Sequence, residues 1–217
     1  MAKWPRYGYC KTRLSKDIGN ENALKVQQKM LFHTISVAEY LSKNHILEIS
    51  IAIDGIGLKK ILRSSNIYGL KSFFPQGKGC LGERMKRQIL LNQRALMPNE
   101  KRNIIIIGTD LPNLCHIDLL EANLKLKNSD VVIGPSNDGG YWLIGFSKRF
   151  ICNKFFIPFI NIKWSKDNVL EKTVDNLSRN NITIDYLISK VDIDTISDLE
   201  QRRKSHSKNF YNYSNFK

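Results

Sequence analysis

The pattern of apolar and polar positions along the chain predicts alternating helices and strands. Residues 20–42 place apolar side chains at the 3.6-residue period of an amphipathic helix. Residues 103–107 (NIIII) and 130–133 are short, largely apolar runs, typical of strands buried on both faces. Further helices are predicted over 58–64, 81–97, 116–127, 166–179 and from Ile196, and further strands over 46–53, 71–74, 141–146 and 182–187. This alternation indicates an α/β fold.

Composition places the chain among globular proteins. Of its 217 residues, 42% are hydrophobic and 25% are charged. No apolar run reaches the roughly 18–20 residues that a membrane helix needs. The first residues show no apolar signal core, and the four cysteines form no C-x-x-C pair. We therefore expect a cytoplasmic protein with reduced thiols and without a membrane span.

We expect one domain over residues 1–200 and a disordered basic tail over residues 201–217. The last sixteen positions contain three lysines, two arginines and no acid, and they lack an apolar period. The whole chain has a formal net charge of +14, which could attract nucleic acid, anionic lipid or a phosphorylated small molecule. Because no nucleic-acid-binding module is recognisable, we favour a solvated lysine-rich surface over an RNA-binding protein.

The unusual residues stand in the polar loops that follow strands, where open α/β sheets bind ligands. Lys11 and Arg13 follow Gly8 in the first loop, and such a loop suits a phosphate group. An exposed basic N-terminus is the plain alternative. Gln76 and Gly77 open the loop QGKG, whose glycines could approach a ligand closely. It is not a P-loop, because no Ser or Thr follows Gly-Lys at the required spacing.

Three acids are candidates for a metal site. Asp110 directly follows the apolar strand NIIII. There a carboxylate could hold Mg²⁺ or Mn²⁺ together with substrate phosphates, or could instead cap the segment that begins Leu-Pro. Asp192 and Asp194 are two residues apart, so on an extended segment they face the same side. Capping of the last helix by Asp194 or Thr195 explains part of this pattern, but it does not explain Asp192.

Five segments occur in the order KTRL, QGKGCLGERM, IIIIGTDLPNL, VVIGPSNDGGYWLIG and DIDTISDL. Together they resemble a bacterial family of glycosyltransferase-like proteins, the radical-SAM- and selenodomain-associated transferases or arsenosugar-biosynthesis glycosyltransferases. The resemblance spans roughly residues 2–200, which is nearly the whole chain. It implies a single-domain GT-A fold, the nucleotide-diphospho-sugar transferase architecture. In that three-layer α/β sandwich, a mixed and mostly parallel central sheet lies between helices.

The resemblance also implies roles for the loop residues. The basic loop and the QGKG loop would bind the nucleotide phosphates, and the three acids would hold Mg²⁺ or Mn²⁺. Asp110 and Asp138 are the catalytic candidates, Asp138 as an acceptor-binding group or as the general base. Four neighbours of Asp138 would contact the acceptor or the sugar: Asn137, Gly139, Gly140 and Tyr141.

We therefore expect a metal-dependent glycosyltransferase that moves a sugar from a nucleotide-diphospho-sugar to a small-molecule acceptor. The alternative on the same fold is a nucleotidyltransferase, similar to guanylyltransferases. Such an enzyme would join an NTP to a phosphorylated acceptor and release pyrophosphate. The same basic loop and the same acids would serve both reactions.

The sequence departs from the family pattern in two places that bear on structure. Family members begin with an apolar strand before the AKWP segment, whereas Met1 stands where that strand should end. We expect a start codon placed too late rather than a missing central strand, because unpaired buried backbone groups cost about 1–3 kcal/mol each. Cys80 replaces the acid usual in the QGxGDLGE motif. This change would impair a chemical role but would be tolerated in a helix cap.

Overall fold

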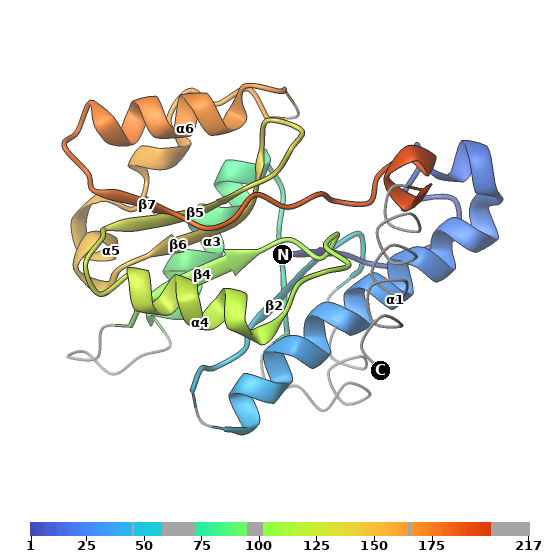
Figure 1. Cartoon of the computed structure of the whole chain (residues 1–217), viewed down its shortest axis with the longest axis horizontal. Helices are drawn as coiled ribbons and strands as arrows, with labels where there is room; N and C mark the ends of the chain where they lie inside the picture. Colours follow the sequence, from blue (N-terminus) through green and yellow to red (C-terminus); the bar gives the residue numbers. More distant parts are fainter. Residues whose placement is uncertain (45, 58–72, 95–101, 165, 201–217) are drawn as a thin grey trace, which may run out of the picture.

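The structure, a computed structural model, describes residues 1–44, 46–57, 73–94, 102–164 and 166–200. Strands form a middle layer and helices cover both of its faces (Figure 1). The helices are α1 (Ser15–Lys43), α3 (Leu81–Arg94), α4 (His116–Lys125), α5 (Lys148–Lys154), α6 (Val169–Ser178) and the 3-10 helix Ile157–Phe159. Helices α1 and α4 pack on one face, and α3, α5 and α6 pack on the other. The predicted three-layer α/β class is confirmed.

The strands fall into two hydrogen-bonded groups, β1-β2-β3 and β4-β6-β5-β7. They are β1 (Ala2–Lys3), β2 (Ile51–Asp54), β3 (Phe73–Pro75), β4 (Ile104–Ile107), β5 (Val131–Pro135), β6 (Tyr141–Phe146) and β7 (Ile184–Tyr186). All pairs are parallel except those that β6 makes with β4 and β5. The Met1 ammonium donates a hydrogen bond of 2.8 Å to Ile107 O, which places the start of β1 beside the end of β4. The expected single sheet is thus interrupted there, because β1 contributes only two residues to its ladder.

Most predicted elements are present with shifted ends. The predicted apolar stripe of the first long helix is confirmed, since its buried positions recur along α1 from Ala23 to Leu41. The strand predicted over 46–53 is shorter and covers Ile51–Asp54. The helix predicted over 58–64 and the basic tail lie outside the described residues. Two short helices, α5 and the 3-10 helix, were not predicted. Residues 196–200 form the start of the expected last helix.

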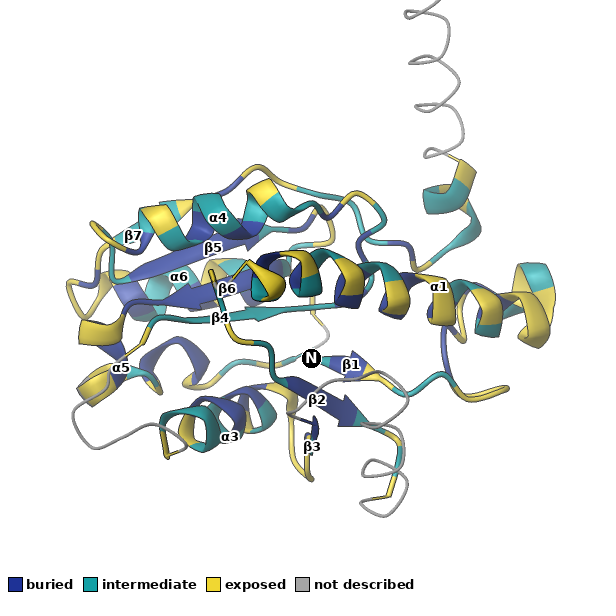
Figure 2. Cartoon of the chain, turned by 90° about the horizontal axis from the view of Figure 1, so that it is seen from below, coloured by how far each residue is buried: buried dark blue, intermediate teal, exposed yellow. Residues whose placement is uncertain are grey.

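One expectation about burial was wrong. The apolar run that forms β4 was expected to be buried on both faces, but all four of its side chains are only partly buried. The physical reason is its position, because β4 is the edge strand of its hydrogen-bonded group and pairs only with β6. The most deeply buried strands are instead β5 and β6, each buried except for one end residue and drawn mostly dark blue between the helices in Figure 2.

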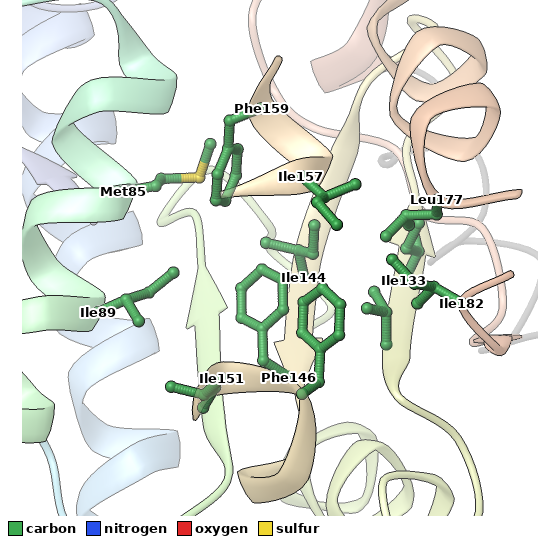
Figure 3. Packing of buried hydrophobic residues seen from close by; sticks show 12 residues of the cluster. Met85, Ile89, Ile133, Ile144, Phe146, Ile151, Ile157, Phe159, Leu177 and Ile182 are labelled. Carbon is green, nitrogen blue, oxygen red and sulfur yellow. The ribbon is translucent and has the colours of Figure 1, made fainter. Parts of the chain in front are cut away.

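The main core lies between β5, β6 and the helices α3 and α6. Figure 3 shows Phe146 and Ile144 of β6 at its centre, with Ile89 of α3 on one side and Leu177 of α6 on the other. These side chains are fully buried, and burying each is worth roughly 1.5–3 kcal/mol. The packing fixes β5 and β6 rigidly, and therefore fixes the loop between them.

Candidate active site

Lys11 lies at the centre of a cluster of charged groups where the first loop meets the segment after β7. Its ammonium lies 2.7 Å from Asp110 Oδ1 and 3.0 Å from Asp194 Oδ1. It also donates a hydrogen bond of 2.6 Å to Ile193 O. Only 3% of the Lys11 side chain is exposed. Burial lowers the pKa of Lys11, but Asp110 and Asp194 outweigh this effect, and the net shift is upward.

The chain reaches this cluster from three directions. Lys11 follows β1 in the first loop, and Asp110 follows β4. The segment after β7 runs across the molecule to the start of α1, as the orange and red trace in Figure 1 shows. There Ile193 packs against Leu14 and Met30, and its backbone N–H donates to Asp110 O at 3.0 Å. Apolar packing therefore positions the carboxylate of Asp194 beside Lys11.

The alternative roles of these acids in helix capping are resolved by the contacts. Helix α4 begins at His116, where Cys115 N donates to Asp118, so Asp110 does not cap it. At the last helix, the side chain of Asp198 accepts hydrogen bonds from the backbone N–H groups of residues 194 and 195. Asp110 and Asp194 are thereby left to contact Lys11.

Asp192 and three other acids, Asp138, Asp110 and Asp194, form a group whose charges act on one another. Burial is the largest cause that raises the pKa of Asp192, followed by the charges of Asp138, Asp110 and Asp194, and together they bring it to about 7. A carboxylate and its like-charged neighbours share such a site only with a compensating cation or proton. The contacts themselves bring together Asp110 and Asp194, through the Lys11 ammonium that both carboxylates touch.

The loop between β5 and β6 holds Asp138 in a fixed orientation. Asp138 Oδ1 accepts hydrogen bonds from Ser136 Oγ at 2.5 Å and from Gly140 N at 3.0 Å. Asn137 Oδ1 accepts a hydrogen bond of 2.7 Å from Ser189 Oγ, which joins this loop to the segment after β7. Asn137 therefore positions the loop, while the second carboxylate oxygen of Asp138 keeps further acceptor capacity.

Gly139 is required by close backbone packing. Its φ is +84°, and a Cβ at this position would lie 1.7 Å from Asp167 O. Its carbonyl accepts a hydrogen bond from Leu170 N at 2.9 Å, at the start of α6. Gly139, which was expected to admit a ligand, is therefore explained by the close approach of the backbone at Asp167.

Tyr141 lies in the core and not with the carboxylates. Its side chain packs against the main core cluster. Burial raises the pKa of its hydroxyl, and a contact with Thr173 opposes this only in part. The next residue, Trp142, packs on the opposite face of β6. Tyr141 therefore supports the loop through its packing in the core.

The QGKG loop is held by α3. Gln76 is buried, and its side-chain amide donates to the carbonyls of Ala2 at 2.9 Å and Ala52 at 3.1 Å. Arg87 donates to Gln76 O, and Arg84 binds both Gly79 O and the carboxylate of Asp54. The side chain of Gln76 thus joins β1 to β2.

Gly77 and Cys80 have backbone roles in the same loop. Gly77 has a φ of +79°, and a Cβ there would meet the Arg87 guanidinium at 2.5 Å. Cys80 stands directly before α3, and its N–H donates to Glu83 at 2.9 Å. Cys80 therefore occupies a helix-cap position, the setting in which its replacement of an acid is tolerated.

An open pocket beside the first loop was missed by the sequence analysis. It has a volume of about 540 Å³ and lies beyond the ends of β1 and β2. Its lining residues are Trp4, Pro5, Arg6, Tyr7, Gly55, Ile56 and Gly57. In the sequence, aromatic residues alternate with the basic residues of the first loop, and this pattern could have predicted the pocket. The sequence prediction used the basic residues alone.

The pocket and the Lys11 cluster are built by one loop. Cys10 Sγ donates to Arg6 O, and Tyr9 N also donates to Arg6 O at 3.0 Å, so the loop turns back on itself. The Arg6 guanidinium lies 4.1 Å from the centre of the Tyr9 ring. Arg13 is exposed in the same loop. One loop thus contributes both to an aromatic pocket and to a cluster of charged groups.

Asp110 and Asp194, with the main-chain oxygen of Ile193, provide hard oxygen ligands of the type that Mg²⁺ and Mn²⁺ prefer. These ligands therefore fit the expected cation. In the structure, all three oxygens contact the Lys11 ammonium. Within the described ranges, no three His, Cys, Asp or Glu side chains already converge as a metal site. A divalent ion would therefore complete its shell with substrate phosphates or water.

Comparison with known proteins first defines the fold. A crystal structure described as a "putative nucleotide-diphospho-sugar transferase" from Desulfovibrio desulfuricans G20 superposes with a TM-score of 0.76. It is 27% identical, and the match covers 91% of this chain and 81% of that one. CMP:2-keto-3-deoxy-manno-octonic acid synthetase in complex with CTP matches with a TM-score of 0.51 and 11% identity, over 83% of this chain and 88% of that one. The chain therefore has the α/β fold of nucleotide-diphospho-sugar transferases.

The family follows from the sequence match. The model of a bacterial family, "Uncharacterized protein conserved in bacteria (DUF2064)", matches residues 37–166. The chain belongs to this family. No curated protein matches. No helix in the described part of the chain is both long enough and apolar enough to cross a membrane.

Proposed function

We propose that this protein is a transferase that binds a nucleotide-diphospho-sugar and passes its sugar to a small-molecule acceptor. The observation that carries the proposal is the adjacency, on one loop, of the aromatic pocket and the Lys11 cluster. A nucleotide has the same two parts, a flat base and a charged phosphate chain. The fold match to a nucleotide-sugar transferase supports this interpretation.

The base would enter the pocket between Trp4 and Tyr7. Aromatic rings are suited to stacking with a base of any identity. The diphosphate would extend from there toward Lys11 and Arg13, which supply positive charge. The sugar would then lie toward Asp138, whose position is fixed by Ser136 and by the backbone of the loop.

The chemical task is to stabilise a departing nucleoside diphosphate. Its negative charge grows as the bond to the sugar breaks, and preorganised positive groups lower the barrier. Lys11 would supply such a positive group, since its buried side chain is directed into the site beside Asp110 and Asp194. Asp138 would bind the acceptor hydroxyl and accept its proton.

A divalent cation, Mg²⁺ or Mn²⁺, is part of the proposal. Asp110, Asp192 and Asp194 would hold it, and when bound it would neutralise charge on the diphosphate. Burial first, and then the charges of the neighbouring carboxylates, raise the pKa of Asp192, and such a cation would relieve the second of these effects.

Calorimetric titration of the full chain with UDP- and GDP-sugars, with and without Mn²⁺, tests the proposal. We expect micromolar binding that requires Mn²⁺ and is lost in Asp110→Asn. The matched control is Asp118→Asn, which removes an acid at the start of α4 outside the carboxylate group. Binding that is indifferent to Mn²⁺ and survives Asp110→Asn would contradict the proposal.

The second candidate is a nucleotidyltransferase that uses the same site. Its support is the shared fold with a CTP-bound synthetase, although this likeness concerns the fold alone. Incubation with each NTP and phosphorylated acceptors separates the two reactions. Release of pyrophosphate identifies a nucleotidyltransferase, and release of a nucleoside diphosphate from a nucleotide-sugar identifies a glycosyltransferase.

A further inference from the structure

The Lys11 ammonium sits where a divalent cation would be expected. It has three oxygen neighbours, at 2.7 Å from Asp110, 3.0 Å from Asp194 and 2.6 Å from the carbonyl of Ile193. Two carboxylates and a carbonyl around one positive centre are also the ligands of a hard divalent ion. The same oxygens cannot surround both cations at once.

The position of Lys11 is built into the fold and is not that of a freely moving surface side chain. Its backbone has a φ of 48°, a left-handed conformation uncommon for residues other than glycine. Leu14, three residues further on, is fully buried against Met30 and Ile193. Backbone strain of this kind persists only where the surrounding structure enforces it.

The contacts also connect distant parts of the sequence. Lys11 joins the first loop to Asp110 after β4 and to the segment that follows β7. Without this ammonium, the carboxylates would face one another without compensation, since Asp192 and Asp138 lie in the same group. A positive charge is therefore needed here in every state of the site.

We propose that Lys11 is the resident cation of this site, and that a divalent ion binds by displacing its ammonium from Asp110 and Asp194. This inference rests on the proposed function for the identity of the ion. After displacement, the freed ammonium stands beside the bound ion, where phosphate oxygens become its partners. Lys11 would thus serve as a counter-ion of the acids before loading and as a phosphate ligand afterwards.

Mn²⁺ titration followed by electron paramagnetic resonance of the free ion, without any nucleotide, tests the exchange. The full chain is compared with Lys11→Met, which keeps most of the length of the side chain and removes its charge. We expect Mn²⁺ to bind Lys11→Met at least about tenfold more tightly, because the variant leaves a buried group of acids without its cation. Equal or weaker binding by Lys11→Met would overturn the proposal, as would the absence of Mn²⁺ binding by both proteins.

Lys190→Met is the matched control. Lys190 is also a largely buried lysine, paired with the carboxylate of Asp118 at 2.6 Å and with the carbonyl of Asn113 at 3.0 Å. Its removal should lower stability without raising the affinity for Mn²⁺. A similar gain in affinity in both variants would show a general charge effect and would contradict a specific exchange at Lys11.

The folding state of Lys11→Met is followed by circular dichroism during thermal unfolding, with and without Mn²⁺. If the variant unfolds without metal, Mn²⁺ should restore the folded signal, and failure to do so overturns the proposal. Because these measurements contain no nucleotide, their outcome is independent of the proposed function. That function fails separately if no nucleotide-sugar binds the unmodified chain.

Discussion

At the scale of single residues, the acids at the strand ends differ in what surrounds them. Asp110 and Asp194 contact Lys11, and Asp138 accepts two hydrogen bonds from its own loop. Burial and three like charges raise the pKa of Asp192 to about 7. The same residue type thus has three different electrostatic environments within one site.

Asp192 should make the stability of the metal-free protein depend on pH. Its folded-state pKa of about 7 exceeds its ordinary value of 3.8, so between these values the folded state binds more protons than the unfolded state. The free energy of unfolding therefore falls as pH rises through this window. In Asp192→Asn this fall should be reduced, and at pH 8 the variant should be about 1–3 kcal/mol more stable.

Urea unfolding in EDTA at pH 4, 5, 6, 7 and 8 measures the effect. Asp175→Asn, an exposed acid of α6 that forms a surface pair with Lys172, is the control. Parallel pH profiles of Asp192→Asn and the unmodified protein would contradict the prediction.

Tyr7 should contribute to nucleotide affinity. It lines the pocket and 62% of the residue is exposed, so its truncation removes a stacking surface and little core packing. Tyr7→Ala should weaken binding of a nucleoside diphosphate by about fivefold or more, since aromatic stacking of a base contributes roughly 1–3 kcal/mol. Tyr40→Ala, a residue of α1 with 56% exposure, is the matched control. Calorimetry that finds equal affinities in both variants would reject the pocket as the base site.

At the scale of elements, the loop between β5 and β6 is positioned from two sides. Its backbone meets the chain before α6 at Gly139, and its Asn137 side chain binds the segment after β7. The residues of each strand are enough to predict that strand. The contacts of Gly139 and Asn137, however, join segments that are far apart in the sequence. The loop is therefore more than a turn that reverses the chain direction.

Gly139→Ala should destabilise the protein by at least about 2 kcal/mol, because it adds a collision with Asp167 O to the strain of a positive φ. Gly8→Ala is the matched control, since Gly8 has a φ of +73° and open space around the position of a Cβ. Thermal unfolding of both variants separates the two effects. Equal losses of stability would show that backbone strain alone matters.

At the scale of the whole molecule, the candidate site is assembled from both ends of the described chain. The first loop supplies Lys11 and the pocket, and the segment after β7 supplies Asp192 and Asp194. A ligand that contacts these parts binds only the folded state. Its binding free energy therefore adds to the free energy of unfolding.

A nucleotide-sugar at about one hundred times its dissociation constant should stabilise the protein by roughly 2.7 kcal/mol. For a chain of 217 residues, this corresponds to a rise in melting temperature of about 5–10 °C. Differential scanning fluorimetry with UDP- and GDP-sugars in Mn²⁺ measures the shift, with the matching nucleosides as controls. Equal shifts with nucleosides would show that the phosphates do not engage the site.

The amino-acid sequence alone could predict the order of most described helices and strands, the α/β class and the loops that carry charged residues. It could do so because hydrophobic periodicity and turn chemistry are local properties, as the buried stripe of α1 shows. The half-buried state of β4 could not be predicted in this way, because it depends on which strand lies beside it.

The tertiary structure sets which of the candidate residues share a site. It placed Lys11 on Asp110 and Asp194, assigned helix capping to Asp118 and Asp198, and turned Tyr141 into the core. These outcomes depend on contacts between residues up to 183 positions apart, which no local pattern encodes. Charge and residue type set what each group can do, and packing determined which partner each group has.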